Sequence, residues 1–428
     1  MRDSTNIIVF SLSRLITELG TSIFRFALSL YVLDLTGSSS MFALVLSFTY
    51  IPGIFVNIIA GVFVDRSRSK KRIMIVCDFL CGISVLTLMF LFQSFHDSIW
   101  LFVVYSMILS ALQALFTLTV NSSVPNIVSP ERVPTVNSST QSIAALIGIL
   151  GPVIGAAAYS KFGLEHIFLI EGAAFILSGF LNLLLKFTPR KEEIGESKPY
   201  FESVKEVYKY IRGRAAIKYL LLIFVFINFV IAPAVSLILP FIVYQALDMT
   251  PQQLSFIEAA LAAGVIIGAV IVSIPVINRF ITNKIFILIQ IQALMIVLWM
   301  FPQWPIFEAS TKVVLMVGFM IVLMFTGILN TMGNIPMLSY VQLYIPERIR
   351  ASVLGVVNTV ITIAVPIGMG VYGALLEVVD WYYITLVSGV GLLAVGILAY
   401  RNRDLREFFT QGMEPEPEPL KVAEVHEA

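Results

Sequence analysis

Residues 61–72 read Gly61-Val-Phe-Val-Asp65-Arg66-Ser-Arg68-Ser-Lys70-Lys71-Arg72, a short basic segment that joins two long apolar runs. The runs lie near 41–64 and 73–93, and each is close to the roughly 20 residues that an α-helix needs to cross a bilayer. Lysine and arginine gather in the cytoplasmic loops of membrane proteins. We therefore predict two membrane helices joined by a tight cytoplasmic turn.

The same alternation of apolar runs and short polar connections extends over nearly the whole chain. Of its 428 residues, 58% are hydrophobic and 13% are charged, whereas an ordinary soluble domain carries roughly 25% charged residues. The further runs of membrane-spanning length lie near 7–33, 98–122, 138–160, 166–187, 217–245, 252–277, 284–302, 311–338, 350–374 and 380–400. The predicted fold class is an all-α membrane protein with twelve transmembrane helices arranged as two six-helix bundles.

Basic residues are unequally shared between alternate connections, which predicts the orientation. The basic connections are 66–72, 186–218, 279–284, 348–350 and 401–406. The alternate connections, on the other side of the membrane, hold only Lys161 and Lys312. The positive-inside rule then places both termini and the central loop in the cytoplasm. We predict a multi-pass protein of a bacterial plasma or inner membrane, with the lipid bilayer as its surroundings and a monomeric state.

An internal repeat divides the chain. Pro130-Glu131-Arg132 precedes the fifth run, and Pro346-Glu347-Arg348 precedes the eleventh, about half a chain length later. Parallel repeats of this kind are a transporter architecture with the substrate site between the halves. The predicted domains are an N-terminal six-helix bundle (1–187), a cytoplasmic linker with an amphipathic helix (188–216), a C-terminal six-helix bundle (217–401) and a flexible cytoplasmic tail (402–428).

Two motifs resemble signatures of the major facilitator superfamily. The segment 61–72 resembles that family's loop signature G-x-x-x-D-R-x-G-R-[RK], with Arg68 where the family has glycine. In the fifth run, Gly148-x-x-Gly151-Pro152-x-x-Gly155-Ala156 is similar to the family's antiporter motif. The opening Glu18-Leu-Gly-Thr-Ser and the run Pro-Asn-Ile-Val-Ser-Pro-Glu-Arg at 125–132 resemble the macrolide-efflux branch.

The resemblance implies roles for these residues. It implies a conformational latch between the two halves, made by Gly61, Asp65, Arg66, Lys70 and Asp78. It implies that Gly148, Gly151, Pro152 and Gly155 seal the halves and favour exchange over leak. The alternatives are a loop whose basic residues only fix topology, and a glycine face that only permits tight helix packing.

Charges within the first run give a separate indication. Arg14, Glu18 and Arg25 fall within about 40° of one another at 100° per residue. Each charge would cost at least about 2.5–3.5 kcal/mol in lipid, so this face should meet protein or a water-filled cavity. We predict that the three residues couple to protons or substrate, and a static Arg14–Glu18 ion pair is the alternative.

Other polar residues inside the predicted helices are candidates for the same roles. Glu171 and Glu258 are further candidate proton carriers, although each could instead lie among lipid headgroups. Four amides and hydroxyls are predicted to line the cavity, namely Gln113, Thr117, Asn330 and Asn334. Hydrogen bonds between helices would explain these four residues almost as well.

The remaining features exclude several classes. The chain has no phosphate-binding loop and no His/Cys cluster, so we predict no ATP hydrolysis, metal, cofactor or enzymatic activity. Its net charge of +1 gives no reason to expect nucleic acid. The leading hypothesis is a secondary active efflux transporter that exports a hydrophobic or amphipathic small molecule by proton antiport. The alternatives are a uniporter or importer of a polar metabolite and a non-transporting membrane regulator.

Overall fold

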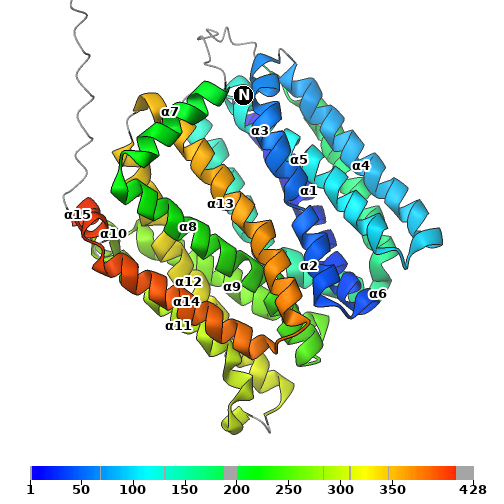
Figure 1. Cartoon of the computed structure of the whole chain (residues 1–428). Coiled ribbons are helices and arrows are strands. Elements are labelled where there is room, and N and C mark those ends of the chain that lie inside the picture. Colours follow the sequence, from blue (N-terminus) through cyan, green and yellow to red (C-terminus); the bar gives the residue numbers. More distant parts are fainter. Residues whose placement is uncertain are drawn as a thin grey trace, which may run out of the picture.

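The computed structural model describes residues 2–67, 69–129, 132–187, 200–282, 284–307, 310–345 and 347–410. These residues form helices joined by short connections, and no β-strand occurs among them. Figure 1 shows the long helices of the first half of the chain lying beside those of the second half. The predicted all-α class is confirmed over the described residues.

The first half crosses the bundle six times. Its helices are α1 (Arg2–Thr36), α2 (Ser39–Phe48), α3 (Ile51–Arg66), α4 (Lys70–Phe95), α5 (Ile99–Ile127) and α6 (Val133–Leu184). Helices α2 and α3 are separated by two residues and together make the second crossing. Helix α6 is 52 residues long and changes direction at Gly163, which has a φ of 70°. Glycine adopts this conformation without the steric cost that a side chain would add.

The hydrogen bonds of α6 show that its two arms run in opposite directions. Along the first arm, Ser139 bonds Ser11 and Tyr159 bonds Asp34, so the arm runs parallel to α1. Along the second arm, Ser178 bonds Asp78, and the carbonyl of Leu183 accepts from Lys71. The second arm therefore runs antiparallel to α4 and returns to the end of the molecule where α1 begins.

The second half has the same general plan with more interruptions. Its elements are α7 (Tyr200–Arg212), α8 (Ala215–Pro233), π-helical turns at Ala234–Ile238 and Phe241–Ala246, α9 (Pro251–Ser273), α10 (Pro275–Thr282), α11 (Ile285–Val297), 3₁₀ turns at Leu298–Gln303 and Pro305–Phe307, α12 (Lys312–Tyr344), α13 (Glu347–Leu376), α14 (Trp381–Arg401) and α15 (Arg403–Thr410). Helix α8 and the π-helical turns form one continuous crossing, as do α11 and its first 3₁₀ turn.

Among the described residues, 11 helices are long and apolar enough to cross a membrane. One of them, Thr135–Leu184, has 50 residues. A helix of that length would extend about 75 Å, more than twice the roughly 30 Å of a bilayer core. Since it also reverses at Gly163, it crosses twice, and the predicted fold of twelve transmembrane helices is confirmed.

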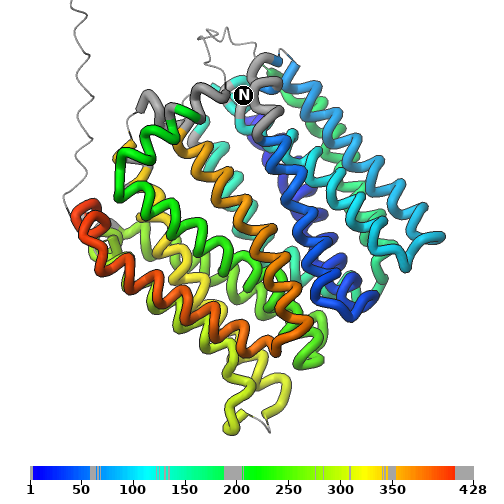
Figure 2. Tube along the Cα trace, in the orientation of Figure 1, coloured from blue at the N-terminus to red at the C-terminus, as the bar shows by residue number. Residues whose placement is uncertain are grey.

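The two halves meet along two pairs of helices. One pair is the first arm of α6 with α9, and the other is α2 with α13. At the second contact Gly373 lies so close to Ala43 that a side chain at Gly373 would overlap the alanine. Figure 2 shows the same arrangement along the chain trace. We call the end of the bundle where α1 begins and α14 ends the terminal face, and the other end the opposite face.

The linker and the tail are partly described. Helix α7 buries Val207, Tyr210 and Ile211 and exposes Tyr208, whereas residues 188–199 and the side chains of Phe201 and Val204 lie outside the described part. The predicted flexible tail, 402–428, needs correction at its start, because residues 403–410 form α15.

Helix α15 forms because it has an apolar face that finds a partner. Leu405, Phe408 and Phe409 are buried, and the Phe409 and Phe408 rings lie against Phe286 and Tyr344 at 5.6 and 4.7 Å between centroids. Burying aromatic side chains of this size offsets the entropy lost on ordering one short helix. Residues 411–428 lie outside the described part of the chain.

Candidate functional site

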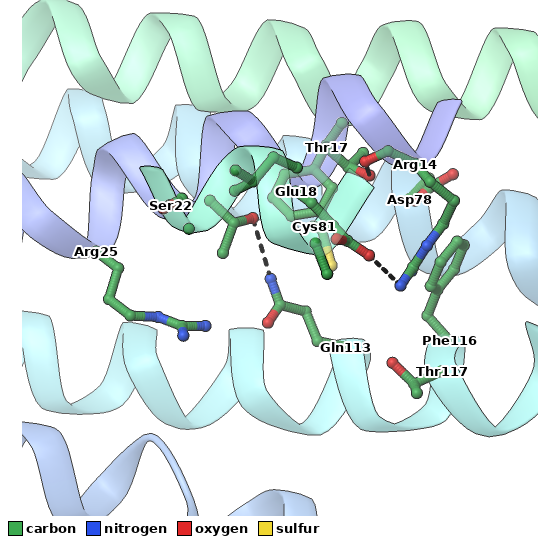
Figure 3. Close-up of a pocket in the computed structure, with 15 residues that line it drawn as sticks. Arg14, Thr17, Glu18, Ser22, Arg25, Asp78, Cys81, Gln113, Phe116 and Thr117 are labelled. Atoms are coloured by element: carbon green, nitrogen blue, oxygen red, sulfur yellow. Dashed lines mark hydrogen bonds and ion pairs between the residues drawn. The ribbon is translucent and has the colours of Figure 1, made fainter. Parts of the chain in front are cut away.

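The charged stripe of α1 lies inside the first half, where it lines a cavity. Arg14 and Glu18 form an ion pair one turn apart, with 15% and 26% of their side chains exposed. The Arg14 guanidinium also lies over the ring of Phe116, 5.6 Å from its centroid. Figure 3 shows Arg25 further along the helix, apart from this pair. The stripe therefore faces a cavity, where its charges avoid the cost of lipid contact.

This cavity is a polar recess of about 360 Å³ between α1, α4, α5 and α6. Residues predicted from the sequence account for much of its lining, namely Arg14, Glu18, Arg25, Asp78, Gln113, Thr117 and Gly148. The Gln113 amide donates to Thr21 Oγ1 at 3.3 Å, which joins α5 to the polar face of α1. Figure 3 shows these side chains converging on one space from different helices.

Asp78 anchors a buried hydrogen-bond network at the back of the recess. Its side chain is 2% exposed and accepts from Ser178 Oγ at 2.8 Å and from Asn182 Nδ2 at 2.7 Å. Ser13 on α1 lies 2.7 Å from Ser178 and donates to Asn182 at 3.2 Å. The network therefore ties α4, α6 and α1 together around one carboxylate.

Glu171 lies within the first half and lines neither the polar recess nor the larger cavity that lies between the two halves. It is fully buried on the second arm of α6, and its Oε2 accepts from Tyr105 at 3.3 Å. Its Oε1 is buried without a hydrogen-bond partner among the described residues. This position excludes the headgroup alternative for Glu171.

A larger cavity, the central cavity, lies between the two halves. Its volume is about 1360 Å³, and it is lined from the first half by α1, α2 and α6 and from the second half by the π-helical turn Ala234–Ile238, α9 and α12. The wall contributed by α9 is mainly apolar and includes Leu261, Val265 and Ile266, with Glu258 beside them. Ser22, Arg25, Ala144 and Gly148 line both cavities, so the polar recess adjoins the central cavity.

The central cavity extends toward the terminal face. Its lining includes Asn137, one turn from the start of α6, and Ser273, the last residue of α9. Both side chains are exposed. Because both lie at helix ends on the terminal face, we infer that the cavity opens there, between α6 and α9.

At the opposite face, by contrast, polar contacts join the halves. Asp34 at the end of α1 accepts from Tyr159 at 2.8 Å and from Tyr244 of the second half at 3.0 Å. Glu377 accepts from Ser38 Oγ at 2.6 Å and from the Ser40 amide at 3.0 Å, at the start of α2. These donors, first of all the Ser38 hydroxyl, hold the pKa of Glu377 below its usual value.

The glycine–proline motif of α6 packs against both halves. A side chain at Gly151 would overlap Ser22, and one at Gly155 would lie 3.2 Å from the Ile23 carbonyl, so both glycines bring α6 close to α1. Gly148 faces Ala262 of α9. Pro152, inside the helix, lines the central cavity. The motif thus lies where α1, α6 and α9 meet.

Several predicted residues lie elsewhere. Gly61, Asp65 and Arg66 are in the last turns of α3, and their side chains are outside the described part of the chain. Lys70 is buried at the start of α4. Asn330 and Asn334 hydrogen-bond each other at 3.0 Å on α12 and line neither cavity.

Sequence reasoning missed part of the cavity wall. Asn137, Ser138 and Gln141 line the central cavity from α6. The i, i+4 spacing of Asn137 and Gln141 places both on one helix face, and polar residues on a membrane helix were the available signal. Asp34 and Glu377 were also missed, because each looks like an ordinary polar residue in a loop.

A chain that crosses the membrane twelve times around a cavity between two helical halves is built as a membrane transporter. Residues 10–364 match the Major Facilitator Superfamily, and the chain belongs to that family. The family and the relatives named below are transporters rather than enzymes.

Relatives of known description are distant but extend over most of the chain. The chain is 23% identical over 398 residues to macrolide efflux protein A of Streptococcus pyogenes, covering 90% of this chain and 93% of that protein. It is 24% identical over 390 residues to the multidrug efflux pump Tap of Mycobacterium tuberculosis (strain CDC 1551 / Oshkosh), covering 88% of each.

Solved structures show the same fold at lower identity. The nucleoside transporter NupG has a TM-score of 0.73 at 14% identity and covers 92% of this chain and 98% of its own. A D-xylose-proton symporter has a TM-score of 0.69 at 14% identity, covering 94% of this chain and 98% of its own. At these identities the likeness supports the fold alone.

Proposed function

We propose that this protein is a secondary active exporter of a hydrophobic or amphipathic small molecule, driven by proton antiport with alternating access. The observation that carries the proposal is the adjacency of the two cavities. A mainly apolar space large enough for a drug-sized molecule opens directly onto a recess with paired charges. The efflux proteins among the relatives support the outward direction.

The charged recess supplies the coupling. Among the carboxylates of the recess, Glu18 forms an ion pair with Arg14, and 26% of its side chain is exposed. Protonation of Glu18 would break its pairing with Arg14 and free the arginine to rearrange. A protonation change is thereby linked to the shape of the wall shared with the central cavity, which is what exchange of a proton for a substrate requires.

The two ends of the molecule fit one stage of alternating access. Under the predicted orientation the terminal face is cytoplasmic, so the cavity opens inward while Asp34 and Glu377 close the outer end. Substrate would enter from the cytoplasm or inner leaflet, and the outer contacts would then open. The latch of Asp65, Arg66 and Asp78 and the domain boundaries given above are part of this proposal.

The test is proton movement in reconstituted vesicles with a pH gradient, on adding macrolides and other lipophilic compounds. We expect compound-triggered proton flux in the wild type and a loss of roughly tenfold or more in Glu18→Gln. Glu165→Gln is the matched control, because this exposed carboxylate lies beside the Gly163 reversal and lines neither cavity.

Each contrary result has a definite meaning. Compound movement without proton flux would replace antiport by uniport. Accumulation on the other side would replace export by import, the direction that a sugar–proton symporter uses. An unimpaired Glu18→Gln would remove Glu18 from the coupling role and leave Glu171 and Glu258 to be tested in the same way.

A further inference from the structure

Among the described residues that line the central cavity, Glu258 is the one carboxylate. It lies on α9, about two turns from the start of the helix, and its side chain is partly exposed to the cavity. Its neighbours on the same wall include Leu261, Ala262 and Val265. The carboxylate is therefore set in an apolar surface that faces the space available to a substrate.

The Glu258 carboxylate has no polar partner among the other described side chains. It forms no ion pair and no hydrogen bond with any described residue, unlike Asp34 and Asp78, which each accept two. A charged group held among apolar side chains is costly unless it is paired. No described residue of the second half pairs with Glu258, so its carboxyl group is available to a molecule that enters the cavity.

Among the described residues that line the central cavity, the only other charged one is Arg25, which has carboxylates of its own half nearby. Arg25 also lines the polar recess, where Glu18 and Asp78 are carboxylates. Its charge acts in addition on Glu171, inside the same bundle. Arg25 thus has carboxylates of its own half around it, whereas Glu258 has no cationic partner among the described residues of the second half.

We propose that Glu258 selects the charge of the substrate, and that the central cavity takes an amphipathic molecule with one positively charged group beside a bulky apolar body. This deepens the proposed function and rests on it for the identity of the site. The proposal gives each half its own role. Glu258 of the second half recognises the charge of the substrate, and the recess of the first half binds and releases the proton.

The residues that line the central cavity determine how it would recognise such a molecule. The apolar residues of α9, with Val235 of the π-helical turn, contact the body of the molecule, and the area that they bury supplies most of the affinity. The carboxylate adds a charge interaction that strengthens where water is displaced. An uncharged or anionic molecule of the same shape would keep the first contribution and lose the second.

The experiment uses two probes of nearly identical shape and opposite charge, tetraphenylphosphonium and tetraphenylborate. Equilibrium binding of each is measured to the full-length purified protein in detergent, without any pH gradient. We expect the wild type to prefer the cation, and Glu258→Gln to bind it roughly tenfold or more weakly with no loss for the anion. Glu258→Asp, which keeps the charge, should keep most of the preference, and Glu165→Gln should match the wild type.

Three outcomes would overturn the proposal. A wild type that binds the anion as tightly as the cation has no charge selection. A Glu258→Gln variant that loses both probes equally has lost packing rather than a charge. A Glu258→Gln variant that keeps the full preference for the cation would show that another group selects the charge. Because the measurement needs neither proton flux nor direction, it can succeed or fail independently of the vesicle experiment.

Discussion

The two halves of this transporter hold their helices together in different ways. In the first half the contacts include a buried polar network beside the glycine packing of α6: Asp78 accepts from two side chains of α6, and Ser13 bonds the same helix from α1. In the second half they are close backbone approaches, since a side chain at Gly264 would overlap the Met324 carbonyl and one at Gly327 would overlap that of Leu261. Lipid offers no hydrophobic force between helices, so either hydrogen bonds or close packing must supply the attraction.

This difference suits the proposed division of work. Polar contacts surround the recess in which the proposed exchange would change the charge of Glu18, and hydrogen bonds hold the neighbouring polar side chains of α4 and α6. Glycine contacts between α9 and α12 need no polar group, so the wall that α9 contributes to the central cavity stays mainly apolar around Glu258. One substitution in each half tests this difference.

The largest effect is expected at Asp78. Asp78→Ala leaves the buried donors of Ser178 and Asn182 without their acceptor, which should cost about 2–4 kcal/mol of stability. Thermal unfolding of the purified protein measures it. Asp78→Asn keeps an acceptor oxygen and should lose roughly half as much. An Asp78→Ala melting temperature equal to that of the wild type would show that the network does not stabilise the first half.

The next effect is expected at Gly264. Gly264→Ala pushes a methyl group into the Met324 backbone, which cannot move aside as a side chain can, and should cost about 1–3 kcal/mol. The control is Gly333→Ala on α12, where the added methyl meets nothing within 4 Å. That control should be neutral or stabilising by up to about 1 kcal/mol, because alanine favours the helix. Equal melting temperatures for the two variants would contradict close backbone packing between α9 and α12.

The sequence could predict the helices far better than their contacts. Lipid requires long apolar runs and segregated basic loops, so the twelve crossings follow from composition and the position of lysine and arginine. The α1 stripe was predictable too, because charges such as Arg14 and Glu18 cannot face lipid. Helix α15 was not, since eight residues with two aromatics resemble any polar tail until a partner surface exists.

Glu171 and Glu258 illustrate the remaining limit. By sequence they are equivalent, because each is a lone carboxylate near one end of an apolar helix. In the structure Glu171 is enclosed beside Tyr105, whereas Glu258 lines the central cavity. Residues that face lipid and residues that face the protein core are both apolar in a membrane helix, so periodicity does not tell which side of the helix a carboxylate occupies.

The smallest effect is expected where the two halves meet at the opposite face. Glu377 accepts from Ser38 and Ser40 across that boundary, and these bonds lower its pKa. A lowered pKa means that the closing contact is complete above the ordinary glutamate value near 4.3 and is lost as the pH falls through the lowered value. Glu377→Gln should weaken the closure at neutral pH by about 1 kcal/mol, a roughly fivefold change in the open population.

Spin labels on Met41→Cys and Val378→Cys report this closure, because both side chains are exposed at that boundary and the native Cys77 and Cys81 are buried. The distance distribution should be narrow at pH 7 and gain a longer component only when the pH falls through the lowered pKa of Glu377. Glu377→Gln should show the longer component already at pH 7 and respond less to acid. A pH response that persists unchanged in Glu377→Gln would assign the acid sensitivity to Asp34, the other carboxylate that joins the halves at this face. The polar contact between the halves would then depend on the bond from Tyr244 to Asp34 rather than on Ser38 and Ser40.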